Sequence, residues 1–247
     1  MKTAIIIPAR YGATRLPGKL LLAETGKTVL QHSWERACAV TGVDRVLIAT
    51  DDMRIKTEAE RFGANAVMTR TDHPAGSNRV AEAAATVDAD LIINLQGDEP
   101  EIDPHAVAHL ITIATAEKSF AATLACPFPN TNDKGPGSAH DPNCVKVVMS
   151  AEKNAKTRAQ RALYFCRSAV PHGGPYFLHI GVYAFRADAL QRFAAAPPTA
   201  LEQTESLEQL RILEMGESIA VGLVKSHAPG IDTRADYDAF VSRHRAG

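Results

Sequence analysis

Short apolar runs alternate with amphipathic stretches over the first half of the chain, and this alternation constrains the fold more than any other feature. The runs TAIIIPA (3–9), RVLIATD (45–51), NAVMTR (65–70) and DLIINLQGDEP (90–100) are typical of strands, and most of them are apolar enough to be buried on both faces. Helix-like stretches such as TVLQHSWERACAV and MRIKTEAERFG separate them, and Gly63 ends the second of these. Such an alternation predicts an α/β fold with a mostly parallel sheet flanked by helices.

After Ser119 the pattern changes to strand-like runs with little helix between them. These runs are FAATLACPF, CVKVVMSA, RALYFCRSAV and LHIGVYAF, and a polar loop, PNTNDKGPGSAHDPN, separates the first two. The stretch LEQTESLEQLRILEMG predicts one strong helix, IAVGLVKS a strand, and RADYDAFVSRHR a closing helix. We therefore expect a single α/β domain over 1–247, with a nucleotide-binding core of 1–125 and 215–247 and an inserted β-rich lobe at about 126–214.

Composition and charge exclude several classes of protein, such as membrane-spanning and strongly basic nucleic-acid-binding proteins. The 247 residues carry 27 Lys and Arg against 28 Asp and Glu, so the formal net charge is −1 and any cationic site must be local. The apolar stretch in the opening MKTAIIIPAR is too short for a signal peptide. No apolar run in the sequence reaches the roughly 18 residues of a membrane span. The four cysteines lie far apart, which indicates reduced thiols. We expect a cytoplasmic protein that binds neither nucleic acid nor a membrane.

The loop ARYGATRLPGK directly after the first strand-like run concentrates positive charge and backbone freedom. Arg10, Arg15 and Lys19 supply three cations, while Gly12 and Gly18 let backbone N–H groups approach a ligand closely. In an open parallel sheet, ligands bind outside the carboxyl ends of the strands, which is where this loop should lie. It matches neither the P-loop nor the dinucleotide pattern. The loop therefore favours a polyphosphate ligand, and a solvated basic loop is the alternative.

Carboxylates follow another buried strand and recur near the end of the chain. Asp98 and Glu99 in QGDEP come just after LIIN, and Asp232 stands in PGIDTRADY. Magnesium prefers a few carboxylates together with phosphate oxygens and water, so carboxylates opposite a phosphate-binding loop suit it. An ordinary turn at QGDEP and an ordinary helix start at Asp232 are the alternatives.

Polar residues in the second half of the chain give a weaker signal. Strand alternation in LHIGVYAFR places His179 and Tyr183 on one face, where they could line a polar ligand, although such residues are more often satisfied within a core. Glu208, Gln209 and Arg211 lie on the expected helix around LEQLR, whose polar face is by default solvated.

Eight motifs occur in one order over nearly the whole chain: IIIPARYGATRLPGK, ATDD, NLQGDEP, DPNCVKVV, ALYFCRSAVP, HIGVYAFR, LEQLRILEMGE and GIDT. In this the sequence resembles the cytidylyltransferase family, and within it the CMP-Kdo synthetases (3-deoxy-manno-octulosonate cytidylyltransferases). The resemblance implies a nucleotide-diphospho-sugar transferase-like fold and a cytoplasmic homodimer formed through the sugar lobe. It also implies an enzyme that couples CTP to Kdo, giving CMP-Kdo and pyrophosphate for lipopolysaccharide biosynthesis, with Mg²⁺ as cofactor.

The resemblance also assigns roles to individual residues. Lys19, Arg15, Asp98 and Asp232 match the catalytic positions, with the two aspartates as metal ligands. The nucleotide contacts implied are Ala9, Arg10, Gly12, Lys19, Arg70 and Gly76, and the sugar contacts are Gln96, Arg167, His179, Tyr183, Glu208 and Gln209. Because the acceptor sugar is an acid, an arginine for its carboxylate and polar groups for its hydroxyls form a sensible division.

One segment departs from the family pattern. Family members read close to DHxSGTER or SGTDR after TR, whereas this chain has TRTDHPAGSNR, with Pro74, Ala75 and Asn78 at altered positions. Ser77 is a suitable N-cap for the helix that follows. Asn78 accepts a hydrogen bond but lacks the charge of the family's acid. A cytidylyltransferase for a different or amino-modified ulosonic acid is therefore one alternative, and a non-catalytic nucleotide-binding protein on the same scaffold is another.

Overall fold

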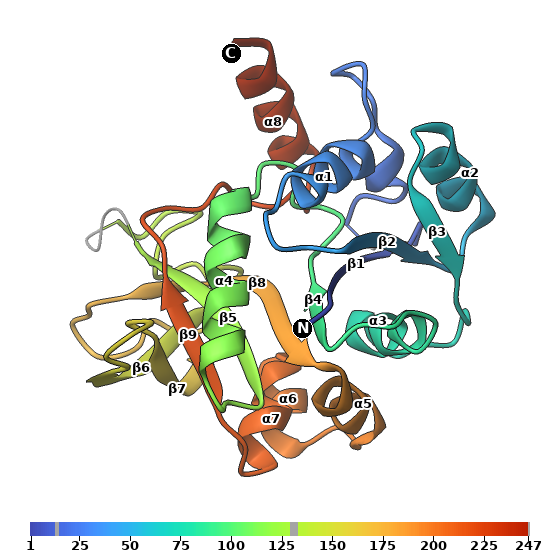
Figure 1. The fold of residues 1–247 in the computed structure, drawn as a ribbon. Coiled ribbons are helices and arrows are strands. Elements are labelled where there is room, and N and C mark those ends of the chain that lie inside the picture. Colours follow the sequence, from blue (N-terminus) through green and yellow to red (C-terminus); the bar gives the residue numbers. More distant parts are fainter. Residues whose placement is uncertain (13–14, 129–132, 247) are drawn as a thin grey trace. The chain divides into compact units, whose positions relative to one another are not determined.

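The structure, a computed structural model, describes residues 1–12, 15–128 and 133–246 (Figure 1). The chain forms two compact units: unit 1 comprises Met1–Ala108 and Ala228–Gly247, and unit 2 comprises His109–His227. The lobe expected at about 126–214 falls inside unit 2. None of the helices in the described ranges is both long enough and apolar enough to cross a membrane.

Unit 1 contains a parallel sheet of four strands in the order β3-β2-β1-β4. In chain order they are β1 (Thr3–Ala9), β2 (Arg45–Thr50), β3 (Asn65–Met68) and β4 (Leu91–Asn94). Ile5 at the centre pairs with Val46 on one side and with Ile93 on the other. The strands and the parallel order confirm the α/β prediction, and their carboxyl ends all lie at one edge of the sheet.

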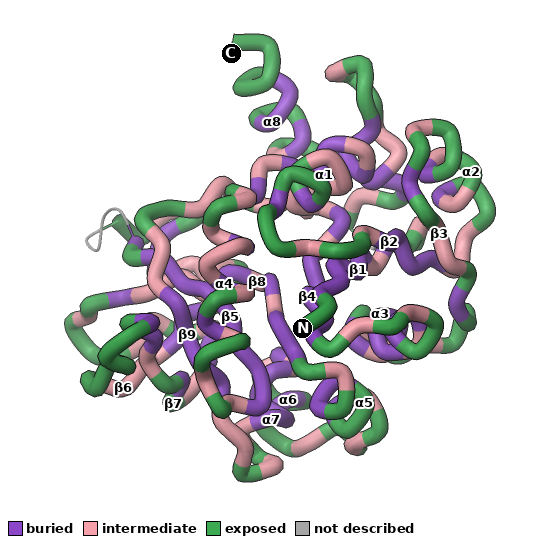
Figure 2. Tube along the Cα trace, in the orientation of Figure 1, coloured by how far each residue is buried: buried purple, intermediate pink, exposed green. Residues whose placement is uncertain are grey.

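Helices cover both faces of this sheet, as the apolar strand sequences require. Figure 1 shows α1 (Val29–Cys38) and α2 (Met53–Arg61) on one face and α3 (Gly76–Ala84) on the other. A short 3-10 helix, η1 (Lys19–Leu21), follows the basic loop, and α8 (Arg234–Ala246) ends the chain. Three consecutive side chains of β1, Ile5, Ile6 and Ile7, have no solvent exposure, because alternate residues point into opposite covered faces (Figure 2).

Local signals explain where these helices start and stop. The Thr28 side chain caps α1 by accepting from the backbone N–H of Gln31, and Asp52 caps α2 by accepting from that of Arg54. Gly63 has a φ of +85° directly after α2, which confirms the predicted glycine stop. The expectation for Ser77 is wrong: a helix capped by Ser77 would begin at Asn78, whereas α3 begins two residues earlier, at Gly76, with Ala75 at the cap position and Ser77 inside the first turn.

Unit 2 is mainly antiparallel, with strands in the order β8-β5-β9-β7-β6. These are β5 (Ala121–Pro127), β6 (Lys146–Lys153), β7 (Gln160–Cys166), β8 (Phe177–Arg186) and β9 (Ile219–Leu223). The β5–β9 pair is parallel, whereas β5–β8, β6–β7 and β7–β9 are antiparallel. The four strand-like runs after Ser119 therefore all form strands, as predicted.

The helices of unit 2 differ from the sequence expectation. The single helix expected over LEQTESLEQLRILEMG is wrong, because the stretch forms α6 (Ala200–Glu205) and α7 (Gln209–Glu214). Ser206 ends α6 with a φ of +54°, a left-handed conformation that does not continue a helix. Helix α5 (Ala187–Ala195) was not predicted, and α4 (Pro104–Ala116) runs across the boundary of the two units in the sequence.

Candidate active site

The ammonium group of Lys19 lies between two carboxylates of unit 1 that are far from it in sequence. Its Nζ donates to Oδ2 of Asp98 at 2.5 Å, to Oδ1 of Asp232 at 2.9 Å and to the carbonyl of Ile231 at 2.7 Å. Arg15 donates to the other oxygen of Asp232 at 2.8 Å. The structure therefore brings together all four residues that the sequence assigned to catalysis.

Three segments form this cluster: two follow the strands β1 and β4, and the third precedes α8. The basic loop after β1 delivers Lys19, and the turn after β4 delivers Asp98. A Cβ at Gly97 would lie 3.2 Å from the carbonyl oxygen of Pro8, so only glycine lets this turn pass so close to β1. The backbone N–H of Ile231 donates to the carbonyl of Asp98 at 2.9 Å, which fixes the third segment beside the second.

Asp232 is further oriented by the start of α8. The carboxylate of Asp236 accepts from the backbone N–H groups of Asp232 at 3.1 Å and Thr233 at 2.7 Å. In return, the hydroxyl of Thr233 accepts from the backbone N–H of Asp236, which completes a capping box. Sequence reasoning missed this anchor, although the T-x-x-D spacing in DTRAD signals it.

Burial and the neighbouring carboxylates have opposite effects on the pKa of Lys19. Its side chain is 10% exposed, and this burial alone lowers the pKa of the lysine. The hydrogen-bonded carboxylates of Asp98 and Asp232 outweigh the burial, so the pKa of Lys19 lies above its ordinary value of 10.5. Lys19 is therefore a fixed positive charge at neutral pH and cannot act as a general base.

The two aspartates suit a magnesium ion better than a metal held by protein alone. Both carboxylates already converge on one cation, the Lys19 ammonium. No group of three or more His, Cys, Asp or Glu side chains converges in this way among the described residues. Magnesium is commonly held by one or two carboxylates plus phosphate oxygens and water, which this donor set fits.

A second anchor of unit 1 joins the ends of β2 and β3 to α3. The buried guanidinium of Arg79 donates to Oδ2 of Asp51 at 2.7 Å and to the hydroxyl of Thr69. The carboxylate of Glu82, also on α3, contacts His73 and accepts from the backbone N–H of Arg70 at 3.1 Å, both on the loop between β3 and α3. The segment that departs from the family pattern is thus held at both ends by ion pairs and hydrogen bonds.

The other nucleotide candidates of unit 1 surround the same edge of the sheet. Ala9 is the last residue of β1, and Arg10 follows it with an exposed side chain. Gly12 is exposed and Gly76 begins α3. Gln96, which was predicted as a sugar contact, lies near the end of β4, and its side chain donates to Asn94 at 3.1 Å.

In unit 2, the strand face predicted to carry His179 and Tyr183 is confirmed. The two rings lie 5.4 Å apart between centroids, on residues that alternate with the buried Ile180 and Val182. The hydroxyl of Thr123 donates to the carbonyl oxygens of Val182 and Ile180. Because its proton is used there, its oxygen accepts from Nε2 of His179 at 3.1 Å. Burial lowers the pKa of His179 to about 3, so the ring is neutral at physiological pH.

Tyr183 carries a buried hydroxyl for which the described residues supply no hydrogen-bond partner. Burial, and then the charge of Glu208, raise the pKa of this phenol well above its ordinary value, so it remains a donor. A buried hydroxyl without a protein partner has a hydrogen bond to offer a bound group.

The remaining sugar candidates of unit 2 are arranged around α7. Glu208 caps this helix and is half-buried, while Gln209 and Arg211 are buried, so a solvated helix face is wrong for these two. Arg211 pairs with Glu202 and has a structural role. The guanidinium of Arg167 donates to the carbonyls of Glu205 at 2.8 Å, Pro142 at 3.0 Å and Ser206 at 3.3 Å.

Known proteins resemble this chain over nearly its full length. The sequence profile of the family described as Cytidylyltransferase matches residues 4–219. A 3-deoxy-manno-octulosonate cytidylyltransferase of Escherichia coli is 41% identical over 95% of this chain and 92% of its own length. The enzyme of the same description from Rhodopseudomonas palustris (strain BisA53) is 46% identical over 96% of this chain and 94% of its own.

A solved structure gives the same result. The structure of CMP:2-keto-3-deoxy-manno-octonic acid synthetase complexed with CTP is 40% identical to this chain and has a TM-score of 0.89. The alignment covers 100% of this chain and 99% of that one. The likeness thus extends over both units.

Proposed function

This chain belongs to the cytidylyltransferase family, and from that premise we propose that it couples CTP to 3-deoxy-manno-octulosonate (Kdo). The anomeric hydroxyl of the sugar attacks the α-phosphorus of CTP, a new P–O bond forms, and the bond to pyrophosphate breaks. The products are CMP-Kdo, for lipopolysaccharide biosynthesis, and pyrophosphate. The observation that carries the proposal is the Lys19 ammonium held by Asp98 and Asp232 beside Arg15.

Catalysis in this reaction consists mainly of positioning and of neutralising phosphate charge. Lys19 and Arg15 supply fixed cations for the triphosphate, and the raised pKa of Lys19 keeps it charged. Asp98 and Asp232 would hold Mg²⁺, which when bound adds Lewis-acid stabilisation of the phosphate oxygens. The carbonyl of Ile231 and the capping box at Thr233 keep Lys19 and Asp232 in place for this role.

The nucleotide would bind at the carboxyl edge of the unit 1 sheet. Ala9 and Gly12 offer backbone groups and Arg10 an exposed cation, directly after β1. Arg70 and Gly76 lie on the segment that Arg79 and Glu82 anchor, which places them beside the ends of β2 and β3. We assign this segment to contacts with the nucleobase.

We assign the sugar acid to the polar residues of unit 2. Groups suited to sugar hydroxyls are the unpaired hydroxyl of Tyr183, the neutral ring of His179, Glu208 at the N-cap position of α7, and Gln209 in its first turn. The three carbonyl bonds of Arg167 use three of its five N–H donors, which leaves two for the sugar carboxylate.

We further propose that the protein works as a cytoplasmic homodimer. CTP is a cytoplasmic substrate, and the four cysteines of the chain are all free thiols in the structure. Unit 2 exposes Leu163 on β7 and Leu201 on α6, apolar side chains of the kind that a partner subunit covers. Light scattering of the purified protein tests the dimer, and a single monomeric mass at micromolar concentration would refute it.

Pyrophosphate release from CTP and Mg²⁺ with a panel of sugar acids tests the reaction. We expect turnover with Kdo. Turnover with an amino-modified relative but not with Kdo would favour the second candidate, which rests on the uncharged Asn78 in the anchored segment. Binding of CTP without turnover on any sugar acid would instead indicate a non-catalytic nucleotide-binding protein.

A further inference from the structure

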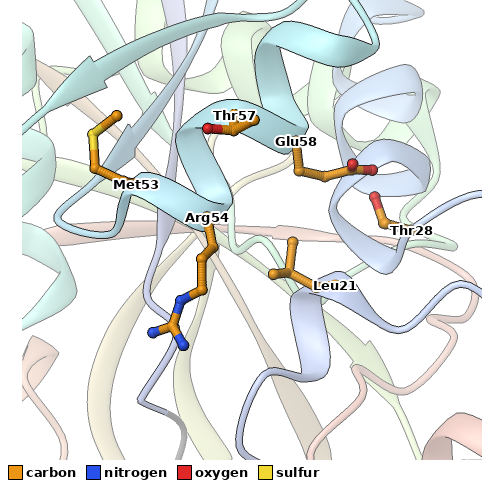
Figure 3. Close-up of a pocket in the computed structure, with 6 residues that line it drawn as sticks. All are labelled: Leu21, Thr28, Met53, Arg54, Thr57 and Glu58. Atoms are coloured by element: carbon orange, nitrogen blue, oxygen red, sulfur yellow. The ribbon is translucent and has the colours of Figure 1, made fainter.

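Arg54, at the start of α2, is exposed, and bonds to a single carboxylate hold its guanidinium. Its Nε and Nη2 donate to the two oxygens of Asp52 at 2.9 and 2.5 Å, and its backbone N–H donates to the same carboxylate at 2.9 Å. Because Asp52 is the cap of α2, the plane of the guanidinium is held in a fixed orientation. Figure 3 shows the side chain extending away from the helix.

The guanidinium held in this way stacks on the first aromatic ring of the basic loop. The Cζ atom of Arg54 lies 3.3 Å from the centroid of the Tyr11 ring. Beside this contact, an open pocket of about 400 Å³ lies against α2 and η1, lined by Leu21, Thr28, Met53, Arg54, Thr57 and Glu58 (Figure 3). Side chains therefore do not fill this region, and the stacked pair provides a link between α2 and the loop.

Tyr11 in turn fixes the residue that precedes Lys19. A Cβ at Gly18 would lie 3.2 Å from two ring carbons and from the hydroxyl oxygen of Tyr11, and the N–H of Gly18 donates to the carbonyl of Tyr11 at 3.0 Å. Gly18 has a φ of +71° and is the cap from which η1 begins at Lys19. The backbone of Lys19 is thus tied to the ring on which Arg54 stacks.

We propose that Arg54 is a positioning residue for the CTP site, which acts through Tyr11 and Gly18 on Lys19. The inference rests on the proposed function of Lys19 as a triphosphate ligand. Among the contacts of the described residues, Arg54 itself touches none of the catalytic carboxylates. Its contribution is to hold the loop base, Tyr11 with Gly18, in the position that places the Lys19 ammonium between Asp98 and Asp232 before CTP binds.

The same helix offers a matched control. Arg61 is also on α2, its side chain is 60% exposed against 59% for Arg54, and it also donates from Nε and Nη2 to one carboxylate, that of Glu58. It does not stack on the loop among the described contacts. R61A therefore removes an equally exposed, equally paired helix arginine without affecting the loop base.

The experiment measures the KM for CTP, the KM for Kdo, the Kd for CTP with Mg²⁺ by calorimetry, and the unfolding midpoint. A cation–π contact at an exposed site is worth enough to change affinity by about two- to fivefold. We expect R54A to weaken CTP binding and raise the KM for CTP by that factor. The KM for Kdo and the unfolding midpoint should match those of R61A.

Substitutions of the ring separate positioning from simple charge attraction. Y11F keeps the ring and should bind CTP as the wild type does, whereas Y11L should resemble R54A. The R54A/Y11L double variant should be no weaker than either single variant, because both act through one contact. R54K keeps the charge but loses the planar fork, so it should recover only part of the affinity.

Three results would overturn the proposal: equal CTP affinity in R54A and R61A, full recovery in R54K, or additive losses in the double variant. Full recovery in R54K would show that Arg54 attracts CTP by its charge, and additive losses would show that Arg54 does not act through Tyr11. Failure of the proposed function has a different signature, namely a wild-type protein without turnover on Kdo. The calorimetric comparison with CTP decides the role of Arg54 in either case.

Discussion

Replacing Lys19 with methionine removes the charge that links Asp98 and Asp232 while keeping a side chain of similar length. In the folded protein this ammonium makes three bonds between 2.5 and 2.9 Å, to two carboxylates and a carbonyl. Loss of one fixed donor that stabilises developing charge commonly costs about 10²- to 10³-fold in kcat, equivalent to about 3–4 kcal/mol. We expect a loss of that size for K19M.

Steady-state pyrophosphate release with saturating CTP, Mg²⁺ and Kdo measures this loss. K19R is the control, because it keeps a cation at the site and should be impaired less than K19M. A K19M variant with more than one tenth of the wild-type kcat would refute the reasoning that Lys19 neutralises charge in the reaction.

The same variant carries a stability prediction with a defined sign. The folded-state pKa of Lys19 lies above its ordinary value of 10.5, so its charge stabilises the fold below pH 10.5. This contribution is lost as the pH rises through the raised folded-state pKa. The difference in unfolding free energy between wild type and K19M should therefore be constant near neutral pH and shrink above about pH 10.5. If this difference in unfolding free energy instead became smaller as the pH fell towards 6, the assignment of the raised pKa to Lys19 would be contradicted.

Three further substitutions test other parts of the structure. R79M leaves the carboxylate of Asp51 without its partner at the end of β2, and a loss of about 3–5 kcal/mol in unfolding free energy is expected from chemical denaturation. G222A places a Cβ 2.3 Å from a side-chain atom of Ile113. The resulting overpacking should reduce the unfolding free energy by about 1–3 kcal/mol and lower the unfolding midpoint. Because the folded-state pKa of His179 is about 3, the fold loses stability as the pH falls below about 6.5, and H179Q should show a shallower acid dependence over that range.

The parallel sheet of unit 1 could be predicted from the sequence because its strands are apolar on both faces. Runs such as TAIIIPA are typical of a strand covered on both faces, and the Gly63 stop identifies the end of α2. The single helix expected around Ser206 failed for a physical reason. No apolar residue stands between Leu201 and Leu207, and the left-handed backbone at Ser206, with a φ of +54°, ends α6 between them.

The sequence predicted the residues of the candidate site more completely than the contacts that hold those residues in place. Position at strand ends was enough to bring Lys19 and Asp98 together, since both follow strands of one parallel sheet. The supporting contacts depend on partners far away in the sequence, and neither the Arg79–Asp51 pair nor the stacking of Arg54 on Tyr11 leaves a spacing signal. Of these supports, only the capping box at Thr233 has a local signature.

The most direct test of the central claim compares wild type with D98N and D232N. In each variant one carboxylate of the pair that holds Lys19 becomes an amide of nearly the same shape. Magnesium-dependent release of pyrophosphate from CTP and Kdo should occur in the wild type and fall at least about 10²-fold in both variants, with unfolding midpoints close to that of the wild type. Near-normal turnover in both folded variants would contradict the assignment of these carboxylates to the reaction.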